Sequence, residues 1–374
     1  MKLVDYSICD IITAFEQSRT IIGVGAGKAL DTFCNEFREY EIDTVFSAIA
    51  DNNKMLSHTM RKTENRQIPI YSVEDIVNEF EMIDIIVITS QYFQDIYRQL
   101  QSFPQLKETK IVFYGFVIDN YCDQKLANGD MDCEIVKMDG VQIPKIIHYC
   151  WFGKSRIPDR YREWMKSWKK YCPDYEIVEW NEDNYDVYKN NYMAEAYEAK
   201  KWGFVPDYAR LDIVSQHGGI YLDTDVEVVQ NLDPLLSQSA FCGFEETYSI
   251  ALGLGFGAVS GNAYILAMRE AYEGKHFKKS DGNYDLTPSP TYQTRTLIEH
   301  GLQPTGRFQI LEDLAVYPKV FFSPMNHYNR KVNKNHHTFT IHHFDGSWVG
   351  NGEKEEWAQF AEIYARMSNN CAVM

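Results

Sequence analysis

The chain has 374 residues, which is enough for two domains of ordinary size. Its net charge of −16, without a long cluster of lysine or arginine, argues against nucleic acid as a partner. No apolar run approaches the length needed to cross a bilayer, and the opening residues lack the layout of a signal peptide. We therefore expect a cytoplasmic protein that meets a membrane, if at all, at its inner face.

Residues 1–130 predict a small α/β domain. Apolar strands alternate with helices along this part of the chain, and residues 83–89 form a continuous apolar strand typical of a parallel sheet. Another strand, from Ile21, leads into a glycine-rich turn that ends at Lys28. The alternation predicts a doubly wound, Rossmann-like unit.

The turn containing Gly25, Gly27 and Lys28 is a candidate second nucleotide site at the start of a helix. The match to a dinucleotide fingerprint is incomplete, because Lys28 stands where the third glycine is needed. Asp51, after the next strand, could meet a ribose or could be a solvated turn. A docking or assembly module without a nucleotide remains the alternative.

Residues 131–142 are polar and predict a linker, so the second domain is expected to span 143–374. It opens with a buried strand over 143–149, followed by the loop that carries Trp151. Ligands of open α/β sheets lie outside the carboxyl ends of the strands. Trp151 is thus placed either to stack on a base or to fill the core.

The stretch 204–229 organises this domain, and it begins as a helix. Asp207 and Arg210 are three residues apart and therefore share one helical face. Gly218 and Gly219 should end the helix, as glycine does after a C-cap.

A short apolar strand over 220–222 then delivers Asp223 and Asp225. Two carboxylates two residues apart on an extended backbone point the same way. Carboxylate oxygens suit Mg²⁺ or Mn²⁺ bound together with substrate phosphates. A solvated turn is the bland alternative, and a phosphatase is a third, although Glu227 stands where such enzymes carry threonine or valine.

The last part of the chain offers further candidates. Residues 252–260 are glycine-rich and apolar, which predicts a backbone that another group approaches closely. Several histidines follow, and an apolar strand over 339–341 would aim them. His343 or Asp345 could complete a metal sphere begun by Asp225.

Together, the segments IPKIIHYCWFG, WNEDNY, DYARLDIVSQHGGIYLDTDVEV and IHHFDGSW resemble the Asp-x-Asp sugar transferases. This group contains bacterial capsule transferases, initiating mannosyltransferases and the clostridial toxin glucosyltransferases, that is, retaining family 32 and its neighbours. The resemblance covers roughly residues 143–350. It implies a nucleotide-diphospho-sugar transferase fold of type A (GT-A), Mn²⁺ or Mg²⁺, a UDP- or GDP-sugar donor, and a glycan or lipid-linked glycan acceptor.

The resemblance also implies roles for single residues. The expected catalytic residues are Asp207, Arg210, Asp223 and Asp225. Beyond these, the expected donor contacts are Trp151, Asn184, Tyr221, Ser347 and Trp348. The expected metal ligands are Asp225 and Asp223, with His343 or Asp345 from the tail.

The family retains the anomeric configuration of the sugar. Glu245 and Glu246 are candidates for a nucleophile only by position, so a front-face reaction is favoured. The first domain resembles Rossmann-like modules beside bacterial polysaccharide-assembly enzymes, which favours a role in capsule, lipopolysaccharide or exopolysaccharide synthesis. Two alternatives stay open: a nucleotide-dependent sugar-modifying enzyme that uses the Gly23–Lys28 turn, and a catalytically dead sugar-binding scaffold.

Overall fold

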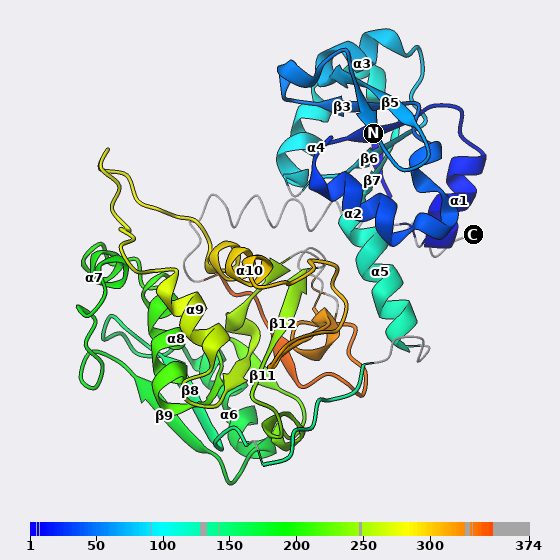
Figure 1. Ribbon diagram of the computed structural model, residues 1–374. Helices are drawn as coiled ribbons and strands as arrows, with labels where there is room; N and C mark the ends of the chain where they lie inside the picture. Colours follow the sequence, from blue (N-terminus) through cyan, green and yellow to red (C-terminus); the bar gives the residue numbers. More distant parts are fainter. Residues whose placement is uncertain are drawn as a thin grey trace. The chain divides into compact units, whose positions relative to one another are not determined.

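The computed structural model describes residues 1–4, 6, 8–90, 92–127, 133–140, 142–246, 249–325, 330 and 332–346. These residues form two compact units, one within 1–127 and the other within 133–346 (Figure 1). Both units combine a sheet with helices, so the predicted α/β class is confirmed. Among the described residues, no helix has the length and apolar character that crossing a membrane requires.

The first unit is built on a seven-stranded sheet in the order β1-β7-β6-β2-β3-β5-β4. Neighbouring strands are parallel except at the β4 edge, where β4 runs antiparallel to β5. The strands are β1 (Lys2–Leu3), β2 (Ile21–Val24), β3 (Ala48–Asp51), β4 (Thr59–Lys62), β5 (Gln67–Ser72), β6 (Ile85–Ile88) and β7 (Lys110–Phe113). Every residue of β2 and β6 is buried, which explains their continuous apolar sequence.

The helices of this unit are α1 (Ile8–Glu16), α2 (Lys28–Glu36), α3 (Val73–Glu79), α4 (Phe93–Gln101) and α5 (Tyr114–Ala127). The Ser72 hydroxyl accepts a hydrogen bond from the Asp75 N–H at 3.0 Å and thereby caps α3. Residues Ile42–Thr44 form a 3₁₀ turn, and strand β3 begins only at Ala48.

The second unit contains a mixed sheet in the order β15-β16-β12-β14-β10-β8-β9, with β13 paired to β12 and a separate pair β11-β17. Its strands are β8 (Ile146–Cys150), β9 (Glu176–Trp180), β10 (Gly219–Tyr221), β11 (Val226–Val228), β12 (Ala240–Glu246), β13 (Ser249–Ile250), β14 (Phe256–Ala258), β15 (Gln309–Leu311), β16 (Leu314–Tyr317) and β17 (Thr340–His342). Its helices are α6 (Asp159–Tyr171), α7 (Asn191–Glu198), α8 (Val205–His217), α9 (Ala263–Glu270) and α10 (Ser289–Glu299). This mixed sheet, flanked by helices, agrees with a GT-A-like α/β fold.

Helix α8 is the most enclosed helix of this unit, and it packs against α7, α9 and strand β8. Asp212 is a buried polar residue of this helix, and its carboxylate accepts hydrogen bonds from the Lys189 Nζ at 2.6 Å and the Tyr185 hydroxyl at 2.8 Å. Gly218 ends the helix at φ 66°, and its N–H donates to the Val214 carbonyl at 2.9 Å. The predicted glycine stop is thus confirmed, and it turns the chain directly into β10.

Candidate active site

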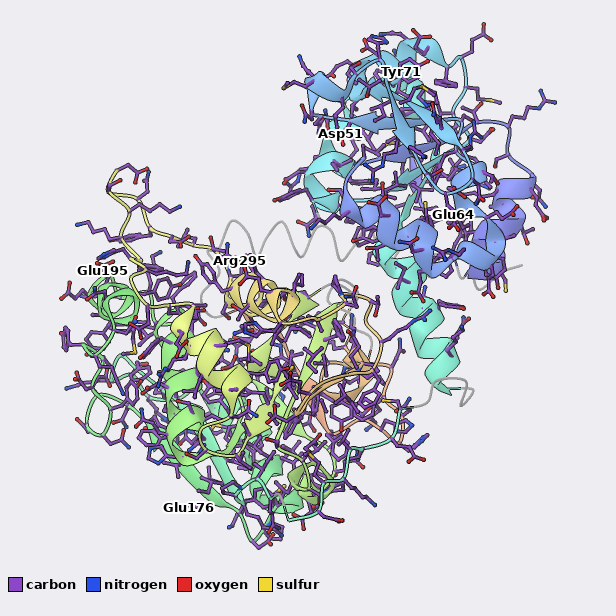
Figure 2. The ribbon with its side chains drawn as sticks, in the orientation of Figure 1. Asp51, Glu64, Tyr71, Glu176, Glu195 and Arg295 are labelled. Carbon is purple, nitrogen blue, oxygen red and sulfur yellow. The ribbon has the colours of Figure 1, made fainter. Side chains whose placement is uncertain are left out.

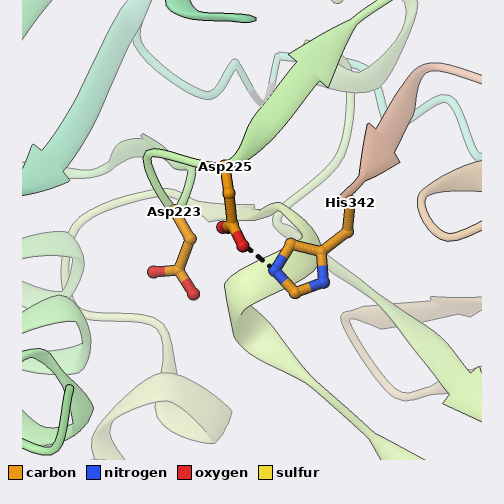
Figure 3. A group of neighbouring side chains, drawn as sticks. All are labelled: Asp223, Asp225 and His342. Carbon is orange, nitrogen blue, oxygen red and sulfur yellow. Dashed lines mark ion pairs between the residues drawn. The ribbon is translucent and has the colours of Figure 1, made fainter. Parts of the chain in front are cut away.

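A carboxylate pair follows β10 and meets a strand from much later in the chain. Strand β11, which begins directly after Asp225, pairs antiparallel with β17 and sets Val226 opposite His342. This pairing brings the His342 Nε2 to 3.2 Å from the Asp225 Oδ1 (Figure 3). Asp223 lies on the other side of Asp225 in the same view.

Asp223, Asp225 and His342 form a group that fits a divalent cation. Each can offer one ligand atom, and these atoms lie within 4.8 Å of one another. Two carboxylate oxygens and one imidazole nitrogen leave positions for the oxygens of a bound diphosphate. The donor set therefore agrees with Mn²⁺ or Mg²⁺.

The charges of this group depend on one another. Burial raises the pKa of Asp223, and the neighbouring Asp225 adds to that shift. Burial acts in the same direction on Asp225, but His342 outweighs it and lowers the pKa of Asp225 to about 2. Burial opposes the protonation of His342, but Asp225 outweighs this effect and raises the pKa of that imidazole, so each of the two groups favours the charged form of the other.

The two tail residues expected to be ligands lie elsewhere. The His343 ring stacks on Trp164 with centroids 4.2 Å apart, and its Nε2 is 3.0 Å from the Glu227 Oε2. Adjacent residues of a strand point to opposite sides. His342, not His343, therefore faces Asp225, and we revise the expected ligand accordingly.

Asp345 contacts Asp225 through its backbone instead of its carboxylate. Its N–H donates to the Asp225 Oδ2 at 3.0 Å. Its carboxylate accepts hydrogen bonds from Arg160 and Tyr161. In this arrangement Asp345 orients Asp225 and is not itself turned toward the metal group. Ser347 and Trp348, which were expected to contact the donor, lie outside the described residues.

Arg210 on α8 lies between Asp207 and the Asp223 carboxylate of the metal group. Its Nη2 lies 3.2 Å from the Asp207 Oδ1 and 3.6 Å from the Asp223 Oδ1. Its guanidinium also lies 5.2 Å from the centroid of the Tyr221 ring, and the Tyr221 hydroxyl donates to Asp223 at 3.0 Å. The predicted common face of Asp207 and Arg210 is present, and both side chains are buried.

Asp207 is the most deeply enclosed carboxylate of this network. Burial raises the pKa of Asp207 to about 7, although Arg210 acts in the opposite direction. Gly253 explains how Asp223 reaches Arg210: a Cβ at that position would lie 2.2 Å from the Asp223 Oδ2. The glycine-rich stretch predicted to allow a close approach does so here.

These side chains open into one cavity of about 580 Å³. Its walls include Trp151, Asp207, Arg210, Asp223, Asp225 and His342. Trp151 is half-buried, and its Nε1–H donates to the Ser155 carbonyl at 2.6 Å, leaving the ring at the cavity wall. Neither Asn184 nor Tyr221 is among the described residues that line this cavity. The Asn184 side chain instead holds its own loop through Glu179 and Asn181.

Some residues of this wall were missed or left open by the sequence. Glu245 of β12 lines the cavity, and burial raises the pKa of its carboxylate. Lys200, Lys201 and Trp202, from the turn between α7 and α8, also line it. Their positions follow from the turn after α7, and neither spacing nor composition indicated them.

The glycine turn of the first unit has a different environment. Gly25 takes φ 114°, and a Cβ there would lie 2.5 Å from the Thr89 carbonyl oxygen. Asp51, at the end of β3 (Figure 2), accepts the Ala26 N–H at 2.7 Å and the Asn53 N–H at 2.8 Å. One N–H of the turn is thus already bonded to a protein carboxylate. Nucleotide binding by Gly25, Gly27 and Lys28 stays a prediction.

Comparison with known proteins points to one class of enzyme. Residues 158–242 match the family described as "glycosyltransferase sugar-binding region containing DXD motif". This region includes α8, β10 and the Asp223-x-Asp225 pair.

Individual relatives agree with that match. Over 148 residues the chain is 34% identical to inositol phosphoceramide mannosyltransferase 3 of Schizosaccharomyces pombe, covering 36% of this chain and 40% of that protein. Over 103 residues it is 33% identical to the mannosyl phosphorylinositol ceramide synthase SUR1 of Saccharomyces cerevisiae, covering 26% and 27%. Among solved structures it is similar to the PaToxG glycosyltransferase, with 16% identity, a TM-score of 0.36, and 49% and 78% of the two chains covered. The chain thus spans less than half the length of these curated relatives, which bear the names of glycosyltransferases.

Proposed function

We propose that this protein is a metal-dependent glycosyltransferase that moves a sugar from a nucleotide-diphospho-sugar to a glycan or lipid-linked glycan. The observation that carries the proposal is the cavity in which Asp223, Asp225 and His342 lie beside Arg210. A cation and a fixed guanidinium are the groups needed where a diphosphate leaves.

Each residue of the site has a separate role in this proposal. Asp223, Asp225 and His342 would hold Mn²⁺ or Mg²⁺, which when bound neutralises negative charge on the leaving diphosphate. Arg210 adds a fixed positive charge on the same side of the cavity. Asp207 offers a buried carboxylate to sugar hydroxyls, and Trp151 offers a ring face to the base.

We propose that the reaction retains the anomeric configuration and takes place on one face of the sugar. Glu245 is a further carboxylate on the cavity wall, so a two-step route through a covalent intermediate would use it. Replacing Glu245 by glutamine separates the two routes, because a front-face reaction should keep most of its rate. A product of inverted configuration would contradict both routes.

We further propose a bacterial setting in polysaccharide assembly, at the cytoplasmic face of a membrane. The support for this is the α/β unit that precedes the second unit along the chain. The names of the fungal relatives refer to ceramide lipids, which supports a lipid-linked acceptor.

The deciding experiment measures nucleotide release from a panel of UDP- and GDP-sugars, with Mn²⁺, with Mg²⁺ and with chelator. We expect one donor to be hydrolysed only with metal, and Asp225→Ala to abolish that turnover. Glu227→Gln is the matched control, because Glu227 lies two residues along the chain and pairs with His343. Metal-dependent binding without turnover would favour the sugar-binding scaffold, and no binding of any donor would overturn the proposal.

A further inference from the structure

The turn between α7 and α8 places two cations and an indole on the cavity wall. Lys200, Lys201 and Trp202 are consecutive, and all three line the cavity that holds the metal group. Among the described residues neither lysine has an ion-pair partner, in contrast to Lys145 and Lys189, which pair with aspartates. The Lys201 Nζ lies 6.0 Å from the centroid of the Tyr284 ring, at the outer limit of a cation–π contact.

The backbone at Lys200 is unusual for a lysine. The Lys200 N–H donates to the Tyr197 carbonyl and the Lys201 N–H donates to the Ala196 carbonyl, both at 2.9 Å. These two bonds form a Schellman motif, in which the residue at the Lys200 position is usually glycine because it adopts the left-handed conformation. Lys200 has φ 56° there, so the chain carries a long cationic side chain where glycine would be less strained. Strain of this kind tends to gather at functional sites.

Trp202 forms a flat surface beside the lysines. A Cβ on Gly153 would lie 2.9 Å from the Cδ2 and Cε2 atoms of the indole, so only glycine permits this close packing. The Gly153 N–H donates to the Glu182 Oε1 at 2.6 Å, which fixes the loop under the ring. Trp202 nevertheless remains 38% exposed, and its free face is available for the apolar face of a sugar ring.

We propose that Lys200, Lys201 and Trp202 form the acceptor subsite, and that the acceptor is a glycan carrying an anionic group, either a phosphate or a carboxylate. This inference rests on the proposed function, in which the metal group and Arg210 already meet the phosphates of the donor. The donor then needs no further positive charge from Lys200 and Lys201, and the two lysines are available to the second substrate. In a chain of net charge −16, an anionic acceptor needs such a local positive region.

The first test compares three glycosides that share one ring: methyl glucoside, methyl glucuronide and methyl glucoside 6-phosphate. Binding to the full-length protein is measured by ligand-observed NMR with Mn²⁺ absent, so it does not depend on turnover. We expect at least one anionic glycoside to bind about fivefold to tenfold more tightly than the neutral one, as two exposed ion pairs allow. The preferred probe distinguishes phosphate from carboxylate, and equal binding of all three would overturn the proposal.

The second test asks which substrate the lysines serve. In the double variant K200M/K201M the preference for the anionic glycoside should disappear, while the KM for donor hydrolysis should stay within about twofold of the original. Lys154→Met is the matched control, because Lys154 is also exposed at φ 57° but is not among the described lining residues. A raised KM for the donor would assign the lysines to the donor and overturn the proposal. If no nucleotide sugar is hydrolysed at all, the proposed function fails, whereas the glycoside binding still reports on the subsite.

The third test uses the strain itself. Lys200→Gly should raise the midpoint of thermal unfolding by about 2–4 °C, because glycine adopts the left-handed conformation without cost. The same variant should lose part of the preference for the anionic glycoside. Higher stability together with unchanged glycoside binding would mean that Lys200 does not contact the acceptor, and would contradict its place in the subsite.

Discussion

The two units each place an aspartate after a buried strand and beside a glycine turn, but the carboxylates do different work. In the first unit, Asp51 accepts N–H groups from Ala26 and Asn53 and thereby closes its own turn. In the second unit, Asp225 contacts His342 and Asp223 lies beside Arg210 at the wall of a cavity. The difference shows that a strand followed by aspartate is not informative by itself. The carboxylate is available for chemistry only where other charged side chains converge on it.

The largest expected effect comes from Arg210. Arg210→Lys keeps the charge but loses the planar fork that lies between Asp207 and Asp223. We expect the rate of metal-dependent donor hydrolysis to fall on the order of 10²–10³. Arg61→Lys is the counterpart in the first unit, where Arg61 pairs with Asp31, and it should leave the rate unchanged. If the rate of Arg210→Lys stays within a few-fold of the original, the convergence of Arg210 on the carboxylates of the second unit is not what makes them catalytic.

Two glycines sharpen the same comparison. Gly253→Ala places a methyl group against the Asp223 carboxylate, so the rate should fall on the order of 10² while the protein stays folded. Gly25→Ala meets the Thr89 carbonyl at positive φ, so it should destabilise the first unit without changing donor hydrolysis. Donor hydrolysis and thermal unfolding of both variants separate the two effects. Loss of activity in Gly25→Ala would indicate that the first unit takes part in catalysis.

Acid should act on the second unit through His148. Burial lowers the pKa of His148 to about 4, although the hydrogen bond between its Nε2 and the Gly218 carbonyl acts the other way. Above pH 6.5 the imidazole is neutral in both the folded and the unfolded state. As the pH falls from 6.5 toward 4 the unfolded state takes up the proton first, so the free energy of unfolding should fall by about 1.4 kcal/mol per pH unit.

This pH dependence can be measured by urea unfolding followed by tryptophan fluorescence. Residues 1–127 contain no tryptophan, and five of the seven tryptophans lie in the described part of the second unit, so the change in signal on unfolding of residues 133–346 can be followed separately from the first unit. His148→Gln should show a smaller loss of stability between pH 6.5 and 4 than the original protein. Equal slopes in the two proteins would assign the acid sensitivity to another group.

The smallest effect is expected at Asp51. Asp51→Ala removes the acceptor of the Ala26 and Asn53 N–H groups, which should cost about 1–3 kcal/mol in the first unit. Circular dichroism should detect this loss, whereas the tryptophan signal and donor hydrolysis should not change. If Asp51→Ala changed the rate of donor hydrolysis, Asp51 would not differ in function from Asp223 and Asp225, and the contrast between the two units would be wrong.

The sequence was sufficient for features that depend on local spacing. The shared face of Asp207 and Arg210, the glycine stop of α8 and the α/β class of both units follow from periodicity and from the conformational freedom of glycine. These properties need no knowledge of distant partners.

Features that depend on register or on rare backbone conformations were not predictable. The choice between His342 and His343 requires the pairing of β11 with β17, because a shift of one residue exchanges the two sides of a strand. The lysine at φ 56° after α7 carries no sequence signal, since the motif normally contains glycine. Asn184, which was expected to contact the donor, is held in its own loop by contacts that spacing does not reveal.

The pairing of β11 with β17 has a consequence for how the protein is made. His342 pairs with a strand that begins directly after Asp225 but follows it by more than a hundred residues, so at roughly 5–20 residues per second it is synthesised about 6–23 seconds later. Until β17 is added, the nascent chain lacks one of the three side chains of the proposed metal group. The proposed metal group is therefore completed only after most of the 374 residues have been synthesised.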